Sequence, residues 1–171
     1  MEIDMANLHG AEAREKIWSL IKDIKVSMMA TSDDAGVFHA RPMMCKQAET
    51  FDGTLWFFTG ADTEKAQEIE NHPTALLTYS DTSAHRYVSV SGRAVIERDR
   101  AKIDALWSDL DKVWFPAGKE DPNLVLIRFE AEEAEFWDTP GAVATGLAYV
   151  KAFMTGELPK VGDVGKANLS H

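Results

Sequence analysis

The chain has 171 residues and a mass of 19.0 kDa, which is the usual size of one domain with a hydrophobic core. Its formal net charge of −10 and isoelectric point near 4.9 argue against broad nucleic-acid binding, because that needs a basic face. No apolar run approaches the roughly 18 residues of a membrane span. The one cysteine, Cys45, excludes an intramolecular disulfide and suits a reducing cytoplasm. We therefore expect one cytoplasmic domain over residues 1–171, without nucleic-acid or membrane partners.

Hydrophobic patterning predicts about seven short strands. The expected strands cover residues 26–32, 37–45, 55–59, 74–80, 86–97, 124–130 and 134–138. Glycine-containing turns separate the first three strands, since glycine adopts the positive φ that tight turns need. The run 86–97 has Gly92 in its middle, where small closed barrels turn their corners. This order predicts a mainly β fold, an antiparallel barrel with helical additions, and not alternating βαβ units.

Helices are expected between and beside the strands. The expected helices are residues 11–24, a short helix that opens within 60–65 and runs to about 71, residues 99–109, and residues 141–154. Asp62 and Asp99 are suitable N-caps for the second and third of these. Residues 155–171 are rich in glycine and lysine, so we expect a loosely held C-terminal tail.

Two cationic residues lie where this order of elements places an anion site. Arg41 is the one arginine of the run 37–45, and Lys65 lies in the first turn of the helix that follows 55–59. If the two strands pair, both side chains converge at a helix start, whose unpaired N–H groups attract anions. A phosphorylated ligand is the natural candidate. The alternative is that both are ordinary surface charges of a hairpin and a helix.

Other kinds of functional site have no sequence signature in this chain. The five histidines are not at metal-ligand spacing, and neither HExxH nor CxxC occurs, so we expect no metal site. GxSxG, GxGxxG and P-loop motifs are also missing. Trp114 and Trp137 lie near turns or strand ends. The sequence leaves three alternatives open for them: a place in the core, contact with a flat aromatic ligand, or a place in a subunit interface.

Several short motifs form an ordered series along the chain. They are Arg41-Pro42-Met43-Met44, Leu55-Trp56-Phe57-Phe58-Thr59, Lys65 with Glu68-Ile69 and Asn71-His72-Pro73, Val90-Ser91-Gly92-Arg93-Ala94, Trp114-Phe115-Pro116, and Glu135-Phe136-Trp137-Asp138. The series resembles the FMN-binding split-barrel family, and within it the general stress protein 26 group of pyridoxamine-phosphate-oxidase-like proteins. The resemblance covers about residues 10–160, and the ordered series is far more specific than any single motif.

The resemblance implies an antiparallel split barrel and a homodimer that holds two FMN molecules at the subunit interface. The implied cofactor-binding residues are Arg41, Pro42, Met43, Met44, Phe58, Thr59, Thr63, Lys65, Trp114, Phe115 and Trp137. Among these, Arg41 and Lys65 would hold the FMN phosphate together with Thr59 and Thr63. The backbone of 42–44 would follow the isoalloxazine edge, and the aromatic residues would approach the ring from the partner chain. FAD is the alternative flavin, because its second phosphate needs just one more local cation.

One departure from the family pattern concerns the residues after Trp137. Pyridoxamine phosphate oxidases continue with a glutamine and then a downstream arginine and histidine that grip the substrate, whereas this chain continues Asp138-Thr139-Pro140-Gly141. We therefore predict that it is not a vitamin B6 oxidase. The first hypothesis is an FMN-binding oxidoreductase of unknown substrate, with no catalytic residue assigned. The alternatives are a non-catalytic protein that binds or senses a flavin or another flat cofactor, such as heme or deazaflavin, and a structural dimer without a ligand.

Overall fold

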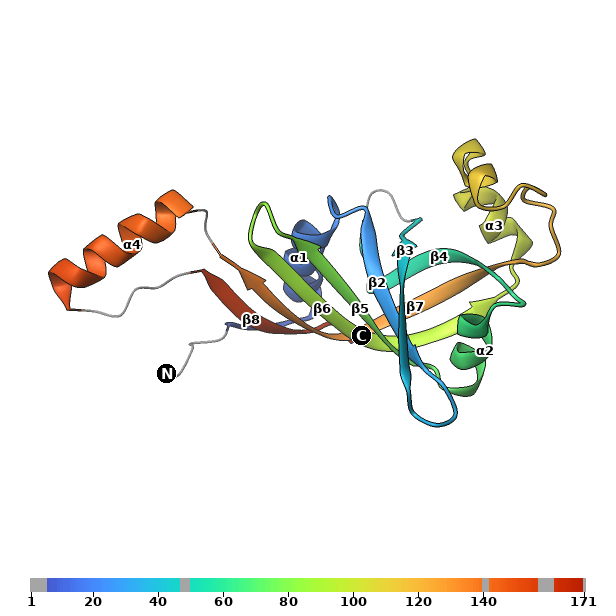
Figure 1. The fold of residues 1–171 in the computed structure, drawn as a ribbon, viewed down its shortest axis with the longest axis horizontal. Coiled ribbons are helices and arrows are strands. Elements are labelled where there is room, and N and C mark those ends of the chain that lie inside the picture. The colour runs from blue at the N-terminus through green and yellow to red at the C-terminus, as the bar shows by residue number, and fades with distance from the viewer. Residues whose placement is uncertain (1–5, 47–49, 140–141, 157–161, 171) are drawn as a thin grey trace.

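The computed structural model describes residues 6–46, 50–139, 142–156 and 162–170 (Figure 1). Its strands are β1 (Ala6–His9), β2 (Val26–Ser32), β3 (Phe38–Met44), β4 (Thr54–Gly60), β5 (Thr74–Asp81), β6 (Arg86–Glu97), β7 (Leu124–Asp138) and β8 (Asp163–Asn168). Its helices are α1 (Gly10–Ile21), α2 (Glu64–Asn71), α3 (Arg100–Leu106), α4 (Ala142–Thr155) and the 3-10 helix η1 (Asp109–Val113). None of the described helices combines the length and apolar character needed to cross a membrane.

The strands form one sheet in the order β1-β8-β7-β6-β5-β2-β3, and β4 pairs with β7 as a branch. All pairs are antiparallel except β1 with β8. Beyond the end of β3, the Lys46 amide donates to the Trp56 carbonyl of β4 at 2.7 Å. Among the described residues β3 and β4 share no ladder, so the barrel is split there. The strand-rich split barrel that the sequence predicted is confirmed.

The core lies inside the barrel, where α1 covers one side. The helix buries Ala13, Ile17, Leu20 and Ile21 at helical spacing, against strand residues that include Phe57. A second apolar cluster around Phe58, Ile103, Leu124 and Leu126 attaches α3 to the outside of β4 and β7. In Figure 1, α3 lies at one end of the molecule and α4 projects from the other.

The predicted corner at Gly92 is confirmed. The register of β6 against β7 shifts between Ser91 and Gly92. A Cβ atom at position 92 would lie 2.1 Å from the Glu130 carbonyl oxygen, so only glycine lets the two strands approach this closely.

The strands at the end of the chain differ from the prediction. Residues 124–138 form one continuous strand and not two, because Ala131 and Ala134 face the core and carry the pairing with β6 past the bulge. Part of the expected tail, Asp163–Asn168, is strand β8, which pairs with both β1 and β7. Residues 140–141, where the final helix was expected to open, and 157–161 and 171, which belong to the expected tail, lie outside the described residues.

Candidate functional site

The end of the barrel beside α2 brings Arg41 and Lys65 together. Arg41 lies on β3, and Lys65 lies in the first turn of α2. Burial lowers the pKa of Lys65, and the positive charge of Arg41 lowers this pKa further. The half-buried Lys65 Nζ donates to Thr59 Oγ1 at 2.9 Å, and within the described part of the chain it forms no ion pair. Two neighbouring cations, one without an acidic partner, make a place where an anion is favoured.

The start of α2 adds to this anion-binding character. Thr63 is its N-cap, because Thr63 Oγ1 accepts from the Ala66 amide at 3.4 Å. The prediction that Asp62 is the N-cap is wrong, because the Asp62 carboxylate accepts a hydrogen bond from Asn123 Nδ2 at 2.9 Å. The N-terminus of a helix carries a partial positive charge, so it acts in the same direction as Lys65.

A buried carboxylate, Glu68 of α2, fixes the position of Arg41. Glu68 is 5% exposed and accepts hydrogen bonds from Thr31 Oγ1 and from Arg41 Nη2, the latter at 3.2 Å. Arg41 Nη1 also donates to Thr31 Oγ1 and, at 2.9 Å, to the His39 carbonyl. Arg41 therefore reaches Lys65 through its contact with α2, and not through the pairing of β3 with β4 that the sequence interpretation assumed.

His39 completes this cluster. Its Nδ1 lies 2.6 Å from Glu68 Oε1, and this hydrogen bond raises the pKa of His39 against a smaller, opposing effect of burial. Burial raises the pKa of Glu68, but the hydrogen bonds from Thr31, His39 and Arg41 outweigh it, so the pKa of Glu68 is held below its ordinary value. Glu68 is thus a charged carboxylate surrounded by donors.

The sequence interpretation assigned no role to His39, Thr31 or Glu68. Ligand atoms of His39, Glu64 and Glu68 lie within 4.8 Å of one another, a grouping that linear spacing does not reveal because it joins a strand to a helix. The hydrogen bond between His39 and Glu68 accounts for two of the three residues in this grouping. The available signal was Glu68 itself, a charged residue beside Ile69 on the buried face of a short helix.

Three of the expected cofactor residues, Met43, Phe58 and Thr59, have buried side chains, and Thr59 is 2% exposed. Met43 is 7% exposed and belongs to the main core, whereas the flanking Pro42 and Met44 are exposed. Phe58 is 7% exposed, and its ring centroid lies 5.8 Å from that of Trp107 and 6.1 Å from that of Phe115. Phe58 therefore joins the barrel to the aromatic loop.

The expected aromatic residues lie in two separate places. Trp114 is exposed and follows η1, while Phe115 is half-buried against Phe58. Thr59 pairs with Val125 of β7. Trp137 lies 12 positions further along the same strand, and 12 residues of strand span roughly 40 Å. Trp137 is thus remote from Lys65 within one chain.

An ion pair anchors the aromatic loop to the barrel. Lys46, just after β3, donates to both carboxylate oxygens of Asp111 at 2.8 and 2.9 Å. Asp111 also accepts from the Ser108 amide at 2.8 Å and so caps η1. Through this pair the loop with Trp114 is held close to the opening between β3 and β4.

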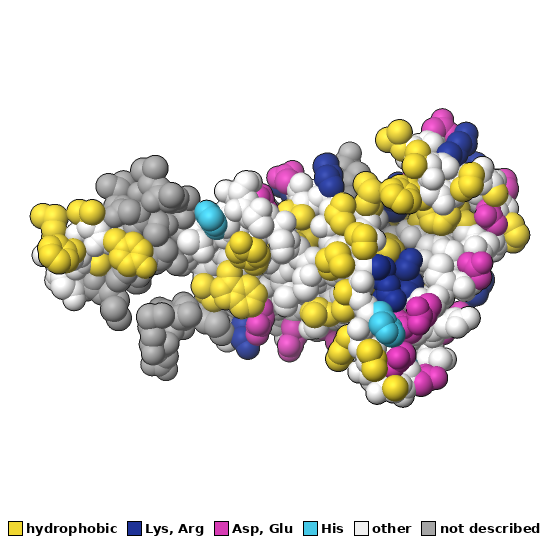
Figure 2. Space-filling model, viewed as in Figure 1, with side chains coloured by type: hydrophobic (Ala, Val, Ile, Leu, Met, Phe, Trp, Pro, Cys, Tyr) yellow, Lys and Arg dark blue, Asp and Glu magenta, His cyan; other side chains and the backbone are white. Residues whose placement is uncertain are grey.

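The outward face of β3, β2 and β5 is apolar. Its exposed side chains are Val26, Met28, Phe38, Met44 and Leu76. Val26 lies opposite Met44, and Met28 opposite Pro42, so these side chains form one continuous surface. Figure 2 shows hydrophobic side chains next to a cluster of basic side chains on this face. We call this surface the apolar sheet face.

Comparison with known proteins gives consistent matches. The sequence model of the family described as "Pyridoxamine 5'-phosphate oxidase like" matches residues 12–160. General stress protein 26 of Bacillus subtilis is 36% identical over 128 residues, which is 71% of this chain and 86% of that protein. The structure of the general stress FMN/FAD binding protein of Xanthomonas citri aligns with a TM-score of 0.66 and 30% identity, covering 77% of this chain and 92% of that one. A structure from Jannaschia sp. CCS1, named for general stress protein 26, aligns with a TM-score of 0.71 and 26% identity over 90% and 96% of the two chains.

Proposed function

The chain belongs to the pyridoxamine 5'-phosphate oxidase-like family, and from this premise we propose that it is a flavin-binding stress-type protein with FMN as its preferred flavin. The observation that carries the proposal is the half-buried Lys65, which lies beside Arg41 and has no acidic partner among the described residues. A dianionic phosphate relieves the repulsion between these two cations. The name of the Xanthomonas citri relative supports the choice of a flavin.

The residues present fit a flavin phosphate. Arg41 and Lys65 supply charge, and Thr59 and Thr63 supply hydroxyl groups. The backbone of 42–44 is proposed to follow the isoalloxazine edge. The flavin, when bound, supplies electron-transfer chemistry, and the protein contributes binding, orientation and exclusion of water.

We propose that the protein is a homodimer with the flavin at the subunit interface. The apolar sheet face, with Phe38 76% exposed, supports a second copy as its partner, because large exposed apolar patches mark interaction sites. A partner chain is also needed to bring Trp137 to the site, since this residue is remote within one chain. Size-exclusion chromatography with light scattering should give a dimer, and Met28→Asp should give a monomer.

The substrate of an oxidoreductase activity is proposed to differ from vitamin B6. The Asp138 carboxylate lies 3.4 Å from Arg86 Nε and 4.0 Å from Lys16 Nζ. Asp138, the residue after Trp137, therefore pairs with the nearby cations Arg86 and Lys16. A carboxylate in this position does not favour a second substrate phosphate. The alternative is a non-catalytic flavin-binding or flavin-sensing protein. Anaerobic addition of NADH or NADPH to the flavin-loaded protein separates the two, because bleaching supports the enzyme and its absence with both donors supports the binder.

A cytoplasmic location is proposed with this function. The single cysteine, Cys45, is compatible with it, because disulfides form and persist in oxidising compartments and one cysteine forms no intramolecular disulfide.

The proposal is tested by comparing FMN with riboflavin, which lacks the phosphate. Arg41→Ala and Lys65→Ala should each lose about 1.5–3 kcal/mol of FMN binding free energy, the usual value of a hydrogen bond to a charged group. Their affinity for riboflavin should stay at the wild-type value. Lys119→Ala is the matched control, since Lys119 pairs with Asp104 on the surface. Wild-type FMN affinity in the Arg41/Lys65 double variant would contradict the phosphate assignment.

A further inference from the structure

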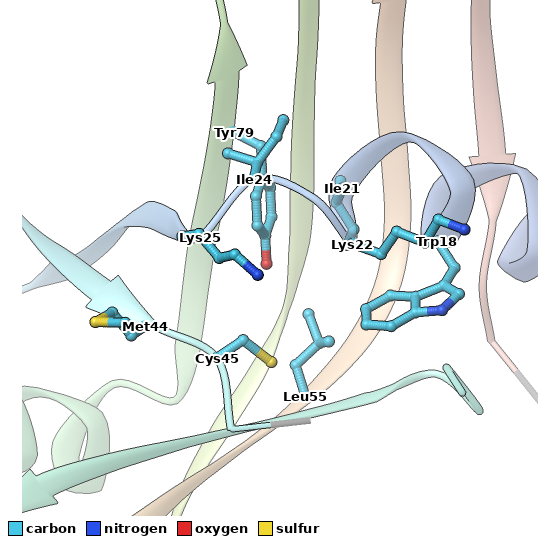
Figure 3. Close-up of a pocket in the computed structure, with 9 residues that line it drawn as sticks. All are labelled: Trp18, Ile21, Lys22, Ile24, Lys25, Met44, Cys45, Leu55 and Tyr79. Carbon is cyan, nitrogen blue, oxygen red and sulfur yellow. The ribbon is translucent and has the colours of Figure 1, made fainter. Parts of the chain in front are cut away.

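The barrel has a pocket at the end opposite Arg41 and Lys65. Its volume is about 100 Å³, and the nine residues that line it are drawn in Figure 3. They come from the end of α1, the segment that leads into β2, the end of β3 with Cys45, the start of β4 and the end of β5. The flavin phosphate site proposed above lies further along two of these strands, at Arg41 in the middle of β3 and at Thr59 near the end of β4. The pocket is therefore distinct from the phosphate site, although Met44 borders both the pocket and the proposed isoalloxazine edge.

A buried hydroxyl group points into this pocket. Tyr79 is 3% exposed, and its Oη has no hydrogen-bond partner among the described residues. The neighbouring Ser27 donates its own hydroxyl to the Met43 carbonyl at 3.3 Å, and it also lies close enough to Tyr79 to lower the pKa of Tyr79, by less than burial raises it. Burial raises the pKa of Tyr79, so the hydroxyl keeps its proton and remains a donor. A buried polar group without a partner is unfavourable, and a ligand atom that accepts from Tyr79 removes this cost.

The other lining residues define the chemistry of a ligand. Trp18, Ile21 and Leu55 give the pocket apolar walls. Figure 3 shows the Lys25 amino group and Tyr79 Oη directed toward the same space, whereas the Lys22 amino group points away from it. Among the residues that the structure describes, no aspartate or glutamate lines the pocket, so the charge of Lys25 has no acidic neighbour there within this part of the chain. The arrangement suits an anionic acceptor attached to a compact apolar body.

We propose that this pocket binds a small carboxylate with an apolar body about the size of benzoate. The carboxylate accepts from Tyr79 Oη and pairs with Lys25. The apolar part lies against Trp18, Ile21 and Leu55. This site is distinct from the flavin phosphate site and adds a second ligand to the protein.

Titration of the full chain with benzoate, followed by amide chemical shifts in NMR spectra, tests this proposal. The wild type should bind benzoate saturably and more tightly than neutral benzamide. Tyr79→Phe and Lys25→Gln should each weaken benzoate binding by at least about tenfold, the effect of losing a hydrogen bond to a charged group. Lys22→Gln is the matched control, because it removes a lysine of the same pocket that points away from Tyr79 (Figure 3), and should leave the affinity unchanged.

Each other outcome overturns the proposal. It fails if the wild type shows no saturation with benzoate, or if all three variants bind as the wild type does. Competition between FMN and benzoate would also overturn it, since the pocket would then belong to the flavin site. Lys25 is exposed, so its substitution keeps the test valid if Tyr79→Phe folds poorly. Loss of FMN binding in the Arg41 and Lys65 variants leaves the benzoate result unaffected, so the two proposals fail separately.

Discussion

Replacement of Glu68 by glutamine tests whether a buried charge holds Arg41 in place. The carboxylate is 5% exposed and accepts from Thr31 and Arg41 while it pairs with His39. Glu68→Gln keeps the shape of the side chain but removes its charge. It leaves the Arg41 guanidinium, 20% exposed, without its counter-ion.

The expected loss of stability follows from the burial of this pair. Breaking a buried ion pair by neutralising one partner costs about 3–5 kcal/mol. The amide oxygen of glutamine still accepts one hydrogen bond, so we expect the lower end, about 3 kcal/mol. For a protein of this length, about 1 kcal/mol lowers the melting temperature by roughly 2–4 °C, so the melting temperature should fall by roughly 6–12 °C.

Urea unfolding followed by circular dichroism measures this loss. Glu70→Gln is the matched control on the same helix. Glu70 lies 3.6 Å from Arg98, and both side chains are more than half exposed, so this pair contributes at most about 1 kcal/mol. If Glu68→Gln costs no more than Glu70→Gln, the carboxylate does not stabilise the position of Arg41 and the argument is refuted.

Three further predictions concern pH and packing. Glu68 raises the pKa of His39 above 6.5. The stabilisation that protonated His39 gives is therefore fully present below pH 6.5 and is lost as the pH rises through the folded-state pKa. An NMR titration should show the pKa of His39 falling in Glu68→Gln. Gly92→Ala should cost about 3 kcal/mol in urea unfolding, because its Cβ meets the Glu130 carbonyl; a cost under about 1 kcal/mol would mean that the bulge relaxes freely. Tyr79→Phe should leave the ligand-free stability unchanged or raise it by about 1 kcal/mol, since the lost hydroxyl has no partner among the described residues; a clear loss would reveal one.

Local sequence patterns predicted the middle strands well. The expected bounds 26–32 and 86–97 are those of β2 and β6, because alternating burial and glycine at the corner are properties of each segment alone. The segment 163–168 gave no such pattern. Gly165 and Ala167 are buried there, and small residues of low strand propensity form a strand only because β1 and β7 lie on both sides.

The candidate site was predicted in part for the same reason. Lys65 is recognisable as a cation in the first turn of a helix, and that information is local. Arg41 was expected beside it only on the assumption that two strands pair, and β3 and β4 form no ladder among the described residues. The carboxylate that positions Arg41 lies 27 residues away on α2, and Thr31 belongs to another strand. Such contacts depend on how α2 crosses the end of the barrel, which propensity and spacing do not determine.

The balance of charge at this site explains how an acidic protein can hold an anion. The net charge of −10 repels free phosphates at long range, so binding must depend on charges closer than about one Debye length, roughly 8 Å in physiological salt. Within that range lie two cations, Arg41 and Lys65, and two carboxylates, Glu68 and Glu64, but Lys65 forms no ion pair among the described residues. Glu68 binds one edge of Arg41, whereas the hydrogen-bond partner of Lys65 in the described part of the chain is a neutral hydroxyl, that of Thr59. The carboxylate therefore fixes the geometry of the site, and Lys65 supplies the charge that remains for a ligand.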